Sequence, residues 1–560
     1  MLPSTILVLF LCGIFNDVIS TPTPPQAVLS VDATTPADPP AQPAGRKLRG
    51  RFLHVTDMHP DGYYRAGASV SSACHSNKPR KEKDRAGWLG TPYDECDSPF
   101  TLTNFTLKHL DKHWADEVDF VIWTGDSARH DNDREIPRTP SEIYNLNRAM
   151  TKRMEEVFTS RGVAVIPSIG NNDVWPHNIM AAGPNSITNE FSNIWQSFIP
   201  FSSFQVFQRG GYFSVEVIPN EVAVVSLNTM YFYDSNKAVG GCEYTEKEDP
   251  GNLEFDWLEV QLDLYRNRDM QVWISGHVPP SPGNYFPGCF VKYADLALRY
   301  QDTILGHLFG HMNADHFFFI EKDDLDLPEE NSRARRKEML DEALLNDFSE
   351  LPKEGKTNLD EFAVVNVAPS VVPNPYVPSF RVFTYNVTGA EEDGGIEARR
   401  KKKKKKGSKR KHGHRRPEKD RPAKECKEKE ERWECRPKKP WYSDASAPSR
   451  KNELWSPLGY AQYWLPDVGS ANDTHGGKFK LEYLTYGLPS LRGDKPIPAR
   501  EVPGRLRNGS YNGRLVPYSM DDLTIGSWVS LGRQLGNPKK RKLRKRFRRY
   551  LYLGLEDDVD

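Results

Sequence analysis

The sequence predicts an α/β fold in which strands alternate with helices, and three observations support this prediction. Short runs rich in Val, Ile, Phe and Trp are typical of buried strands. Between them lie stretches with apolar residues at every third or fourth position, which is typical of helices. Five apolar runs end in polar, metal-capable residues, which is where open α/β sheets carry their functional side chains.

The predicted elements alternate along the chain. Strands are expected at 51–56, 118–123, 163–169, 212–217, 222–227 and 270–275. Helices are expected at 101–114, 140–160, 189–198 and 253–265, with a last helix at 520–535. The apolar stripe of the second helix indicates a face that packs on a core; it consists of Ile143, Leu146, Met150 and Met154.

The two ends of the chain and its charged runs suggest how the chain is divided into segments. The apolar run Ile6–Phe15 is shorter than the about 20 residues that a membrane span needs. Residues 1–20 are therefore expected to be a signal peptide or an uncleaved signal-anchor, followed by a Pro-rich linker at 21–47. The remaining predicted segments are a main folded body at 48–390, a basic low-complexity insertion at 391–440, the end of the body at 441–500, and a C-terminal helix and basic tail at 501–560.

Basic residues are concentrated in two runs. Lys+Arg and Asp+Glu both total 76, so the formal net charge is zero and the rest of the chain is acidic on average. The run 399–411 contains only two non-basic residues and is expected to be solvated and disordered. The run 539–549 includes apolar residues. Three roles remain open for these runs: solvated filler, electrostatic binding of a polyanion, and nuclear targeting, which conflicts with the N-terminal segment.

Cysteines and glycosylation triplets fit a secretory route. Apart from Cys12, there are six cysteines, an even number that allows three disulfides. Pairing neighbours gives Cys74–Cys96, Cys242–Cys289 and Cys426–Cys435, one of fifteen connectivities. Asn-x-Ser/Thr triplets, at which N-glycans are expected, occur at Asn104, Asn386, Asn472 and Asn508.

The first predicted strand ends in Asp57-x-His59. One carboxylate and one imidazole two residues apart can bind a single metal ion. A short strand followed by a polar turn would look the same, so this motif alone is weak. Four later apolar runs end similarly, in Gly125-Asp126, Gly170-Asn171, Gly276-His277 and Gly310-His311. Glycine allows the sharp turn that brings a ligand close, and five such endings make a metal site the favoured interpretation.

The order of these motifs resembles that of the calcineurin-like metallophosphoesterases, specifically their acid-sphingomyelinase-like branch. The motifs Asp-Met-His-Pro-Asp at 57–61, Gly-Asn-Asn-Asp at 170–173 and Gly-His-Met-Asn-Ala-Asp-His at 310–316 are most similar to fungal members that cleave inorganic polyphosphate. The resemblance covers residues 48–390 and continues near 450–495. It implies a four-layer αββα sandwich, with two sheets packed face to face between outer helices and the basic insertion outside it.

The resemblance also implies a ligand set for two divalent ions. One ion would be bound by Asp57, His59 and Asp126, and the second by Asp126, Asn171, His277 and His311. Asp126 would bridge the two ions. Oxygen and nitrogen ligands suit Zn, Mn, Mg, Co or Fe, and the sequence does not choose among them. Two such ions clamp a phosphoryl group and lower the pKa of a bridging water toward about 7, so that hydroxide attacks phosphorus.

Two residues depart from the family pattern. The family usually ends in Gly-His-x-His, whereas Asn313 follows Gly310-His311 here and offers only an amide oxygen. The family usually has His after the Gly-Asn asparagine, whereas Asn172 cannot donate a proton as an acid. His130 matches another active-site His of the branch and is expected to serve as the acid. Arg129 beside it is expected to bind a phosphate through two hydrogen bonds.

The expected function is internal cleavage of inorganic polyphosphate in a fungal vacuole, in its lumen or on a single-pass membrane anchor. The substrate and compartment come from the resemblance, since the ligand types indicate only a phosphoester or phosphoanhydride hydrolase. The alternatives are a sphingomyelinase-like phosphodiesterase and a non-catalytic polyanion-binding protein on the same fold. No nucleic-acid partner is expected.

Overall fold

The computed structural model describes residues 47–243, 245–325, 339–390, 444–487, 497–498, 500–507 and 513–554. The signal or anchor segment, nearly all of the linker, the 391–440 insertion with Cys426 and Cys435, and Asn508 lie outside these ranges. Among the helices within them, none is both long and apolar enough to cross a membrane.

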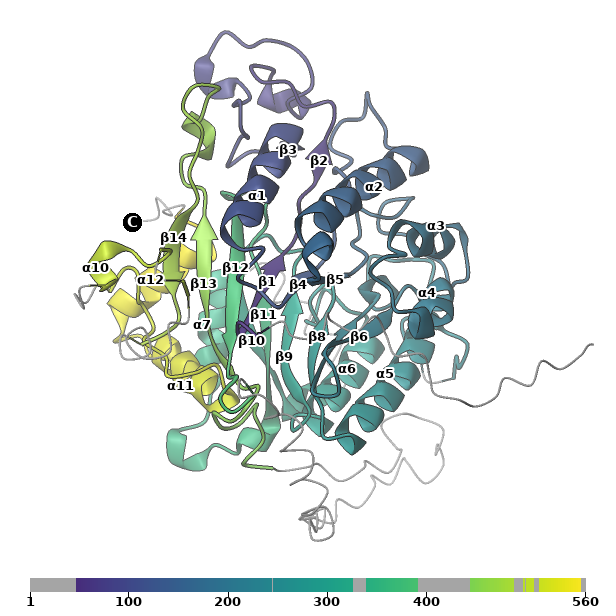
Figure 1. The fold of residues 1–560 in the computed structure, drawn as a ribbon, viewed down its shortest axis with the longest axis vertical. Coiled ribbons are helices and arrows are strands. Elements are labelled where there is room, and N and C mark those ends of the chain that lie inside the picture. Colours follow the sequence, from purple (N-terminus) through teal and green to yellow (C-terminus); the bar gives the residue numbers. More distant parts are fainter. Residues whose placement is uncertain are drawn as a thin grey trace, which may run out of the picture. The chain divides into compact units, whose positions relative to one another are not determined.

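Two six-stranded sheets form the centre of the described chain (Figure 1). The first has the order β14 (Lys480–Leu484), β13 (Pro457–Trp464), β12 (Ser379–Tyr385), β1 (Arg51–Val55), β4 (Phe120–Trp123) and β5 (Ala164–Pro167). The second has the order β10 (His316–Glu321), β11 (Phe362–Val367), β9 (Ile304–Phe309), β8 (Gln271–Ser275), β7 (Val222–Ser226) and β6 (Phe213–Ile218).

The sheets pack against each other through aromatic and small polar side chains. Phe52 of β1 contacts Trp273 of β8 with ring centroids 4.9 Å apart. Ser168, just after β5, and Ser226 of β7 place their hydroxyls 2.9 Å apart. All five residues of β1 are buried, as expected for a strand covered on both faces.

Helices cover the outer faces. Those beside the first sheet are α1 (Phe100–His113), α2 (Pro140–Val157) and α3 (Ser186–Ile194), and those beside the second are α4 (Phe204–Gly210), α5 (Pro250–Asn267) and α6 (Pro287–Arg299) (Figure 1). The helices α7 (Leu340–Glu350) and α11 (Ile525–Gly536) pack where Phe317 of β10 contacts Phe348 and Trp528. A short helix, α10, spans Gly504–Arg507. The αββα sandwich implied by the resemblance is confirmed.

Local capping explains where helices begin. Thr139 accepts a hydrogen bond from the Glu142 backbone, and Pro140 occupies the first turn, where no N–H is needed. Asn185 and Thr188 form a reciprocal cap, so α3 begins at Ser186, three residues before the start predicted from apolar spacing alone.

The chain after the insertion completes the first sheet. β13 pairs with β12 and β14 pairs with β13, both antiparallel. The run predicted as a basic tail is instead a helix, α12 (Arg541–Leu551), because Phe547, Tyr550 and Leu551 provide it with a buried apolar face.

Two predicted disulfides are confirmed: Cys74–Cys96 and Cys242–Cys289, with Cα atoms 5.7 and 5.1 Å apart. The first closes the long segment between β1 and α1, which also contains a two-residue ladder of β2 (Pro60–Asp61) with β3 (Ser98–Pro99). The segment predicted as a long loop is therefore anchored beside the end of β1.

A buried ion pair joins the two sheets. Arg381 of β12, fully buried, pairs with Asp315, which precedes β10. Asp315 also accepts hydrogen bonds from Gln462 and Tyr483, at 2.8 and 2.6 Å. The carboxylate thus ties β12, β13 and β14 to β10.

Replacing Arg381 by Met is expected to lower the free energy of unfolding by about 3 kcal/mol or more, because it leaves the Asp315 carboxylate buried without its cation. Urea denaturation measures this. The matched control is Arg153→Met, which breaks an exposed pair with Glu156 and should cost less than about 1 kcal/mol. Equal stability of the two variants would show that the buried pair does not stabilise the sheets.

Candidate metal centre

The predicted ligands come from strand ends in both sheets. β1, β4 and β5 are parallel, so Asp57, Asp126 and Asn171 leave the first sheet at the same edge. β8 and β9 are parallel in the second sheet and deliver His277 and His311. Face-to-face packing brings the two edges together.

The backbone turns sharply at these ligands. Positive φ angles occur at Asp57 (50°), His59 (38°), Asp126 (54°), His311 (70°) and Asn313 (53°), all non-glycine residues. Such conformations cost about 1–3 kcal/mol each and are maintained only where surrounding contacts determine them. Five of the sixteen non-glycine residues with positive φ in the described part of the chain are thus predicted metal ligands.

Two glycines allow the close approach. A Cβ atom on Gly170 would clash with Asp126 Oδ1, and one on Gly310 would clash with Thr56 Oγ1 and Asp57 Oδ2. Glycine is needed at both positions because side-chain atoms of a neighbouring ligand loop lie against its backbone and leave no room for a Cβ atom.

Asp126 lies at the centre of the cluster. Its Oδ2 is 3.3 Å from His59 Nε2 and 3.2 Å from His277 Nε2. Asp57 approaches from the first side, with its Oδ1 3.7 Å from His59 Nε2. On the other side, Asn171 Oδ1 lies 2.8 Å from His277 Nε2. This arrangement matches a carboxylate shared between two cation positions.

Backbone carbonyls set the orientation of two histidines. His59 Nδ1 lies 2.7 Å from the Ala128 carbonyl, and His277 Nδ1 lies 2.7 Å from the Thr124 carbonyl. Because a carbonyl only accepts, each Nδ1 carries the proton and each Nε2 faces the cluster. This is the usual outer-shell arrangement of a metal-bound histidine.

The donor atoms fit cations. Asp57 Oδ1, His59 Nε2 and Asn313 Oδ1 are buried and form no hydrogen bond. Within the described residues, Asp57, Asp126 and His277 offer ligand atoms within 4.8 Å of one another, as do His59, Asp97 and His130. Buried polar atoms without partners cost free energy, which a bound cation would offset.

Charge within the cluster shifts the pKa of its members. Burial lowers the pKa of His59, but the Asp126, Asp57 and Asp97 carboxylates outweigh it and raise that pKa to about 9. Burial also lowers the pKa of His277, but the Asp126 carboxylate outweighs it and raises that pKa to about 9. Since a cation needs unprotonated Nε2 atoms, protons and cations compete for this site.

The Asn172 side chain contacts the Asp126 carboxylate. Its backbone N–H donates to Asp126 Oδ1 and its Nδ2 donates to Asp126 Oδ2, both at 2.8 Å. The side chain thus positions the central carboxylate. Asn313 donates through Nδ2 to the Asn374 carbonyl at 2.8 Å, which leaves its Oδ1 available as the predicted weak ligand.

His130 is paired with a residue that sequence reasoning missed. Asp97 accepts from the backbone N–H of His130 and lies against its Nδ1, each at 2.6 Å. The His130 ring stacks on His59 with centroids 3.9 Å apart. With 22% of its side chain exposed, His130 is in contact with both solvent and the cluster. Asp97 carries no local motif and is recognised only in three dimensions.

Arg129 does not serve as the predicted phosphate ligand. The side chain is buried, pairs with Glu142 and donates to the carbonyls of His130 and Ile136. Its guanidinium is therefore committed to holding the loop after β4. Arg138 has a related role, since its Nη1 donates to the carbonyls of Arg129 and Asn172, at 2.9 and 2.7 Å.

His75 was also missed. It is buried and lies between two carboxylates, with Nε2 2.7 Å from Asp61 and Nδ1 2.7 Å from Asp133. Burial lowers its pKa, but hydrogen bonds to Asp61 and Asp133 outweigh it and raise the pKa above its usual value. This interaction joins the disulfide-closed segment to the loop of His130.

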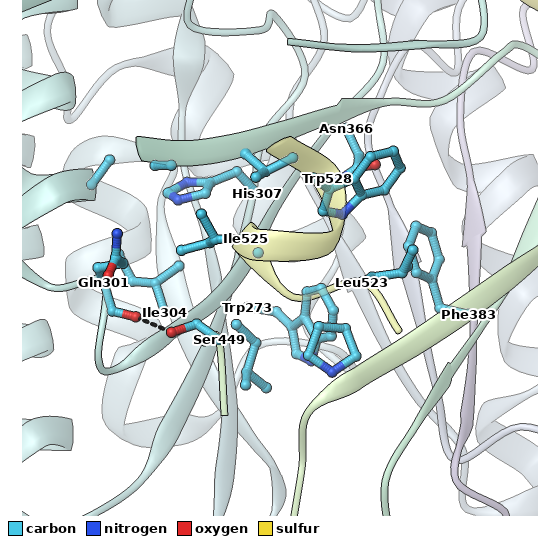
Figure 2. A pocket seen from close by; sticks show the side chains of 16 residues that line it. Trp273, Gln301, Ile304, His307, Asn366, Phe383, Ser449, Leu523, Ile525 and Trp528 are labelled. Atoms are coloured by element: carbon cyan, nitrogen blue, oxygen red, sulfur yellow. Dashed lines mark hydrogen bonds between the residues drawn. The ribbon is translucent and has the colours of Figure 1, made fainter. Parts of the chain in front are cut away.

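Three other histidines belong to the core. His54 hydrogen-bonds Thr124, His307 hydrogen-bonds Tyr293, and His316 contacts the Ala314 carbonyl. His307 also lines a small cavity, which includes Asn366 and Trp528 (Figure 2). Its volume of about 20 Å³ suits one water molecule and not a substrate.

The chain is similar to known fungal proteins along most of its length. A curated endopolyphosphatase of Cryptococcus neoformans is 39% identical over 92% of this chain and 92% of its own length. The chain belongs to the endopolyphosphatase family. The calcineurin-like phosphoesterase profile matches residues 50–314. The Neurospora crassa endopolyphosphatase is 31% identical over 96% of this chain and 85% of its own length.

Two further matches cover a smaller part of this chain. The Saccharomyces cerevisiae endopolyphosphatase is 41% identical, over 56% of this chain and 45% of its own length. A solved dimetal phosphatase from Danio rerio aligns with a TM-score of 0.34 and 12% identity, over 60% of this chain and 92% of its own, and supports no inference.

Calorimetric titration with Mn²⁺ or Zn²⁺ should show two equivalents bound by the wild-type endopolyphosphatase-family protein. Asp126→Ala should lose both high-affinity sites, because both positions share that carboxylate. Asn313→Ala should weaken only one site, by about 10-fold. Asn472→Ala, on the surface, is the control. Two unchanged equivalents in Asp126→Ala would contradict the shared carboxylate.

His75→Gln should destabilise the protein most at low pH. The raised pKa means that the folded state holds the imidazolium more tightly, so its contribution is complete below about pH 6.5 and is lost as pH rises through the folded-state pKa. The free energy of unfolding of both proteins, measured between pH 5 and 9, should therefore converge as pH rises. His475→Gln, an exposed control, should show a constant difference. A gap that widens with pH would contradict this role.

Proposed function

We propose that the chain is a metal-dependent endopolyphosphatase, which hydrolyses internal phosphoanhydride bonds of inorganic polyphosphate to give shorter chains. Its family membership supports the substrate, since the relatives that define the family are named for this activity. The single structural observation that carries the proposal is the convergence of Asp57, His59, Asp126, Asn171 and His277 on one buried centre.

Two divalent cations at this centre would supply Lewis-acid charge for phosphoryl oxygens and make a bound water more acidic. Asp57, His59, Asp126 and Asn313 would hold one, and Asp126, Asn171, His277 and His311 the other. His311 approaches the second position through Nδ1, which lies 2.9 Å from Asn171 Oδ1. The identity of the metals is open among Zn, Mn, Mg, Co and Fe.

His130 is the group best placed to move a proton. Asp97 fixes its Nδ1, so its Nε2 is free to face a leaving-group oxygen at the solvent side of the cluster. A polyphosphate leaving group is a good one and needs little protonation. The use of Asn172 to position Asp126, in place of a second histidine, therefore costs less for a phosphoanhydride than for an alkyl phosphoester.

We further propose that the protein acts in the fungal vacuole, reached through the secretory pathway and with the N-terminal segment as an anchor. The two disulfides favour an oxidising lumen. Asn104 and Asn472 are exposed and Asn386 is half-buried, so N-glycans are sterically plausible at the first two.

The test is incubation of purified protein with long-chain polyphosphate and a panel of divalent metals, with product lengths resolved on a gel. Internal cutting gives intermediate lengths early, and Asp126→Ala should give none. Steady release of phosphate from chains of otherwise full length would mean end-on cutting. No breakdown under any metal, together with hydrolysis of sphingomyelin, would replace the proposal by a phosphodiesterase.

A further inference from the structure

The C-terminal helix α12 concentrates positive charge on a fixed support. Its eleven residues include seven Arg or Lys and no acid. Phe547, Tyr550 and Leu551 are buried, and the Tyr550 ring packs at a tilt against Tyr483 of β14 with centroids 4.6 Å apart. The Arg548–Asp341 pair and the hydrogen bond from Tyr552 to Asp341, at 2.5 and 2.9 Å, anchor its C-terminal end.

That anchored end lies beside the metal-ligand loop. The Leu551 carbonyl accepts a hydrogen bond from the Asp315 backbone at 3.0 Å, and Asp315 follows His311 by four residues. Four residues span at most about 14 Å, so the end of α12 lies within roughly 17 Å of His311. Tyr552 also contacts Tyr376, two residues after the Asn374 that holds Asn313.

Three of the cations on α12 lie on its outward face. Within the part of the chain that the structure describes, no ion pair is found for Lys542, Lys545 or Arg546. Spaced three and four residues apart, they form a stripe on one side of the helix. Like charges at this spacing repel and destabilise the helix, and a bound anion would reduce this repulsion.

We propose that this stripe binds the part of a polyphosphate chain that extends beyond the cleavage site. The inference rests on the proposed function for the identity of the substrate. A substrate with one negative charge or more per phosphate is complementary to a row of cations, and release of its counterions favours binding. The C-terminal end of the helix lies beside the metal-ligand loop and its charged face continues away from it, so one chain can contact both.

A membrane surface fits the helix less well. A helix that binds a bilayer buries its apolar face among lipids. In α12 that face is already packed against the protein, through Phe547, Tyr550 and Leu551. Only the charged face remains for a partner, which favours a soluble polyanion over a membrane.

The test compares wild type with the triple variant Lys542→Gln, Lys545→Gln, Arg546→Gln. The matched control removes the same charge from exposed lysines on α1 and α2: Lys108→Gln, Lys112→Gln, Lys152→Gln. KM is measured for long-chain polyphosphate and for tripolyphosphate. Lys542 lies about 14 Å along the helix axis from Leu551, so a three-phosphate chain at the metal centre does not extend along the stripe.

The α12 variant should raise the ratio of the two KM values about 10-fold, and the control should change it less than twofold. Binding of fluorescently end-labelled long-chain polyphosphate should weaken in parallel. The slope of the logarithm of the binding constant against the logarithm of the salt concentration should become shallower by about 2, as expected from three lost phosphate contacts.

Three results would overturn the proposal: an unchanged KM ratio and salt slope, an equal effect of the control, or a loss confined to anionic phosphatidylserine vesicles in co-sedimentation. The measurement of polyphosphate binding distinguishes failure of the proposed function from failure of the α12 proposal. If wild type cleaves no polyphosphate, the proposed function fails, yet a difference in binding between the two triple variants would still assign the stripe a polyphosphate-binding role.

Discussion

The Asp126 carboxylate is the group on which the rest of the site depends. It is buried between both sheets, and although burial alone raises its pKa, His277 and His59 hold that pKa well below its usual range. Asn172 directs two N–H groups at its oxygens. Asp173 in turn accepts from the backbone N–H groups of Asp126, Ser127 and Gly170, which fixes the left-handed turn at Asp126.

One short loop acts as the template for ligands from other strands. Thr124 and Ala128, on either side of Asp126, use their carbonyls to orient His277 and His59. The Asp126 carbonyl accepts from the backbone of Met58 and His59. Arg129 and Arg138 then tie this loop to α2 and to Asn172. Ligand positions that are far apart in the chain are thereby fixed relative to one segment of six residues.

Much of this site could be predicted because each ligand directly follows an apolar strand. Parallel strands of one sheet place such residues at one edge, so Asp57, Asp126 and Asn171 converge, and the packing of the two sheets adds His277. The positioning residues were not predictable in this way. Asp97 and His75 lie in an irregular segment; the partner of Asp97 is 33 residues away, and those of His75 are 14 and 58 residues away. Arg129 was misassigned because its neighbour Glu142 is brought near only by the start of α2.

The same distinction applies to α12. Its charge predicts a basic tail, and the packing of Phe547 and Tyr550 against the body makes it a helix. Periodic apolar residues in a strongly basic run are a weak signal, because three buried side chains among eleven residues do not outweigh self-repulsion until the rest of the fold is present.

The central claim is that one carboxylate bridges two cations between the sheets. A crystal structure of protein grown with Mn²⁺ or Zn²⁺, with anomalous scattering recorded at the metal edge, tests it most directly. The account predicts two peaks about 3.5–4 Å apart, both within bonding distance of Asp126. A single peak, or peaks that do not share Asp126, would contradict it.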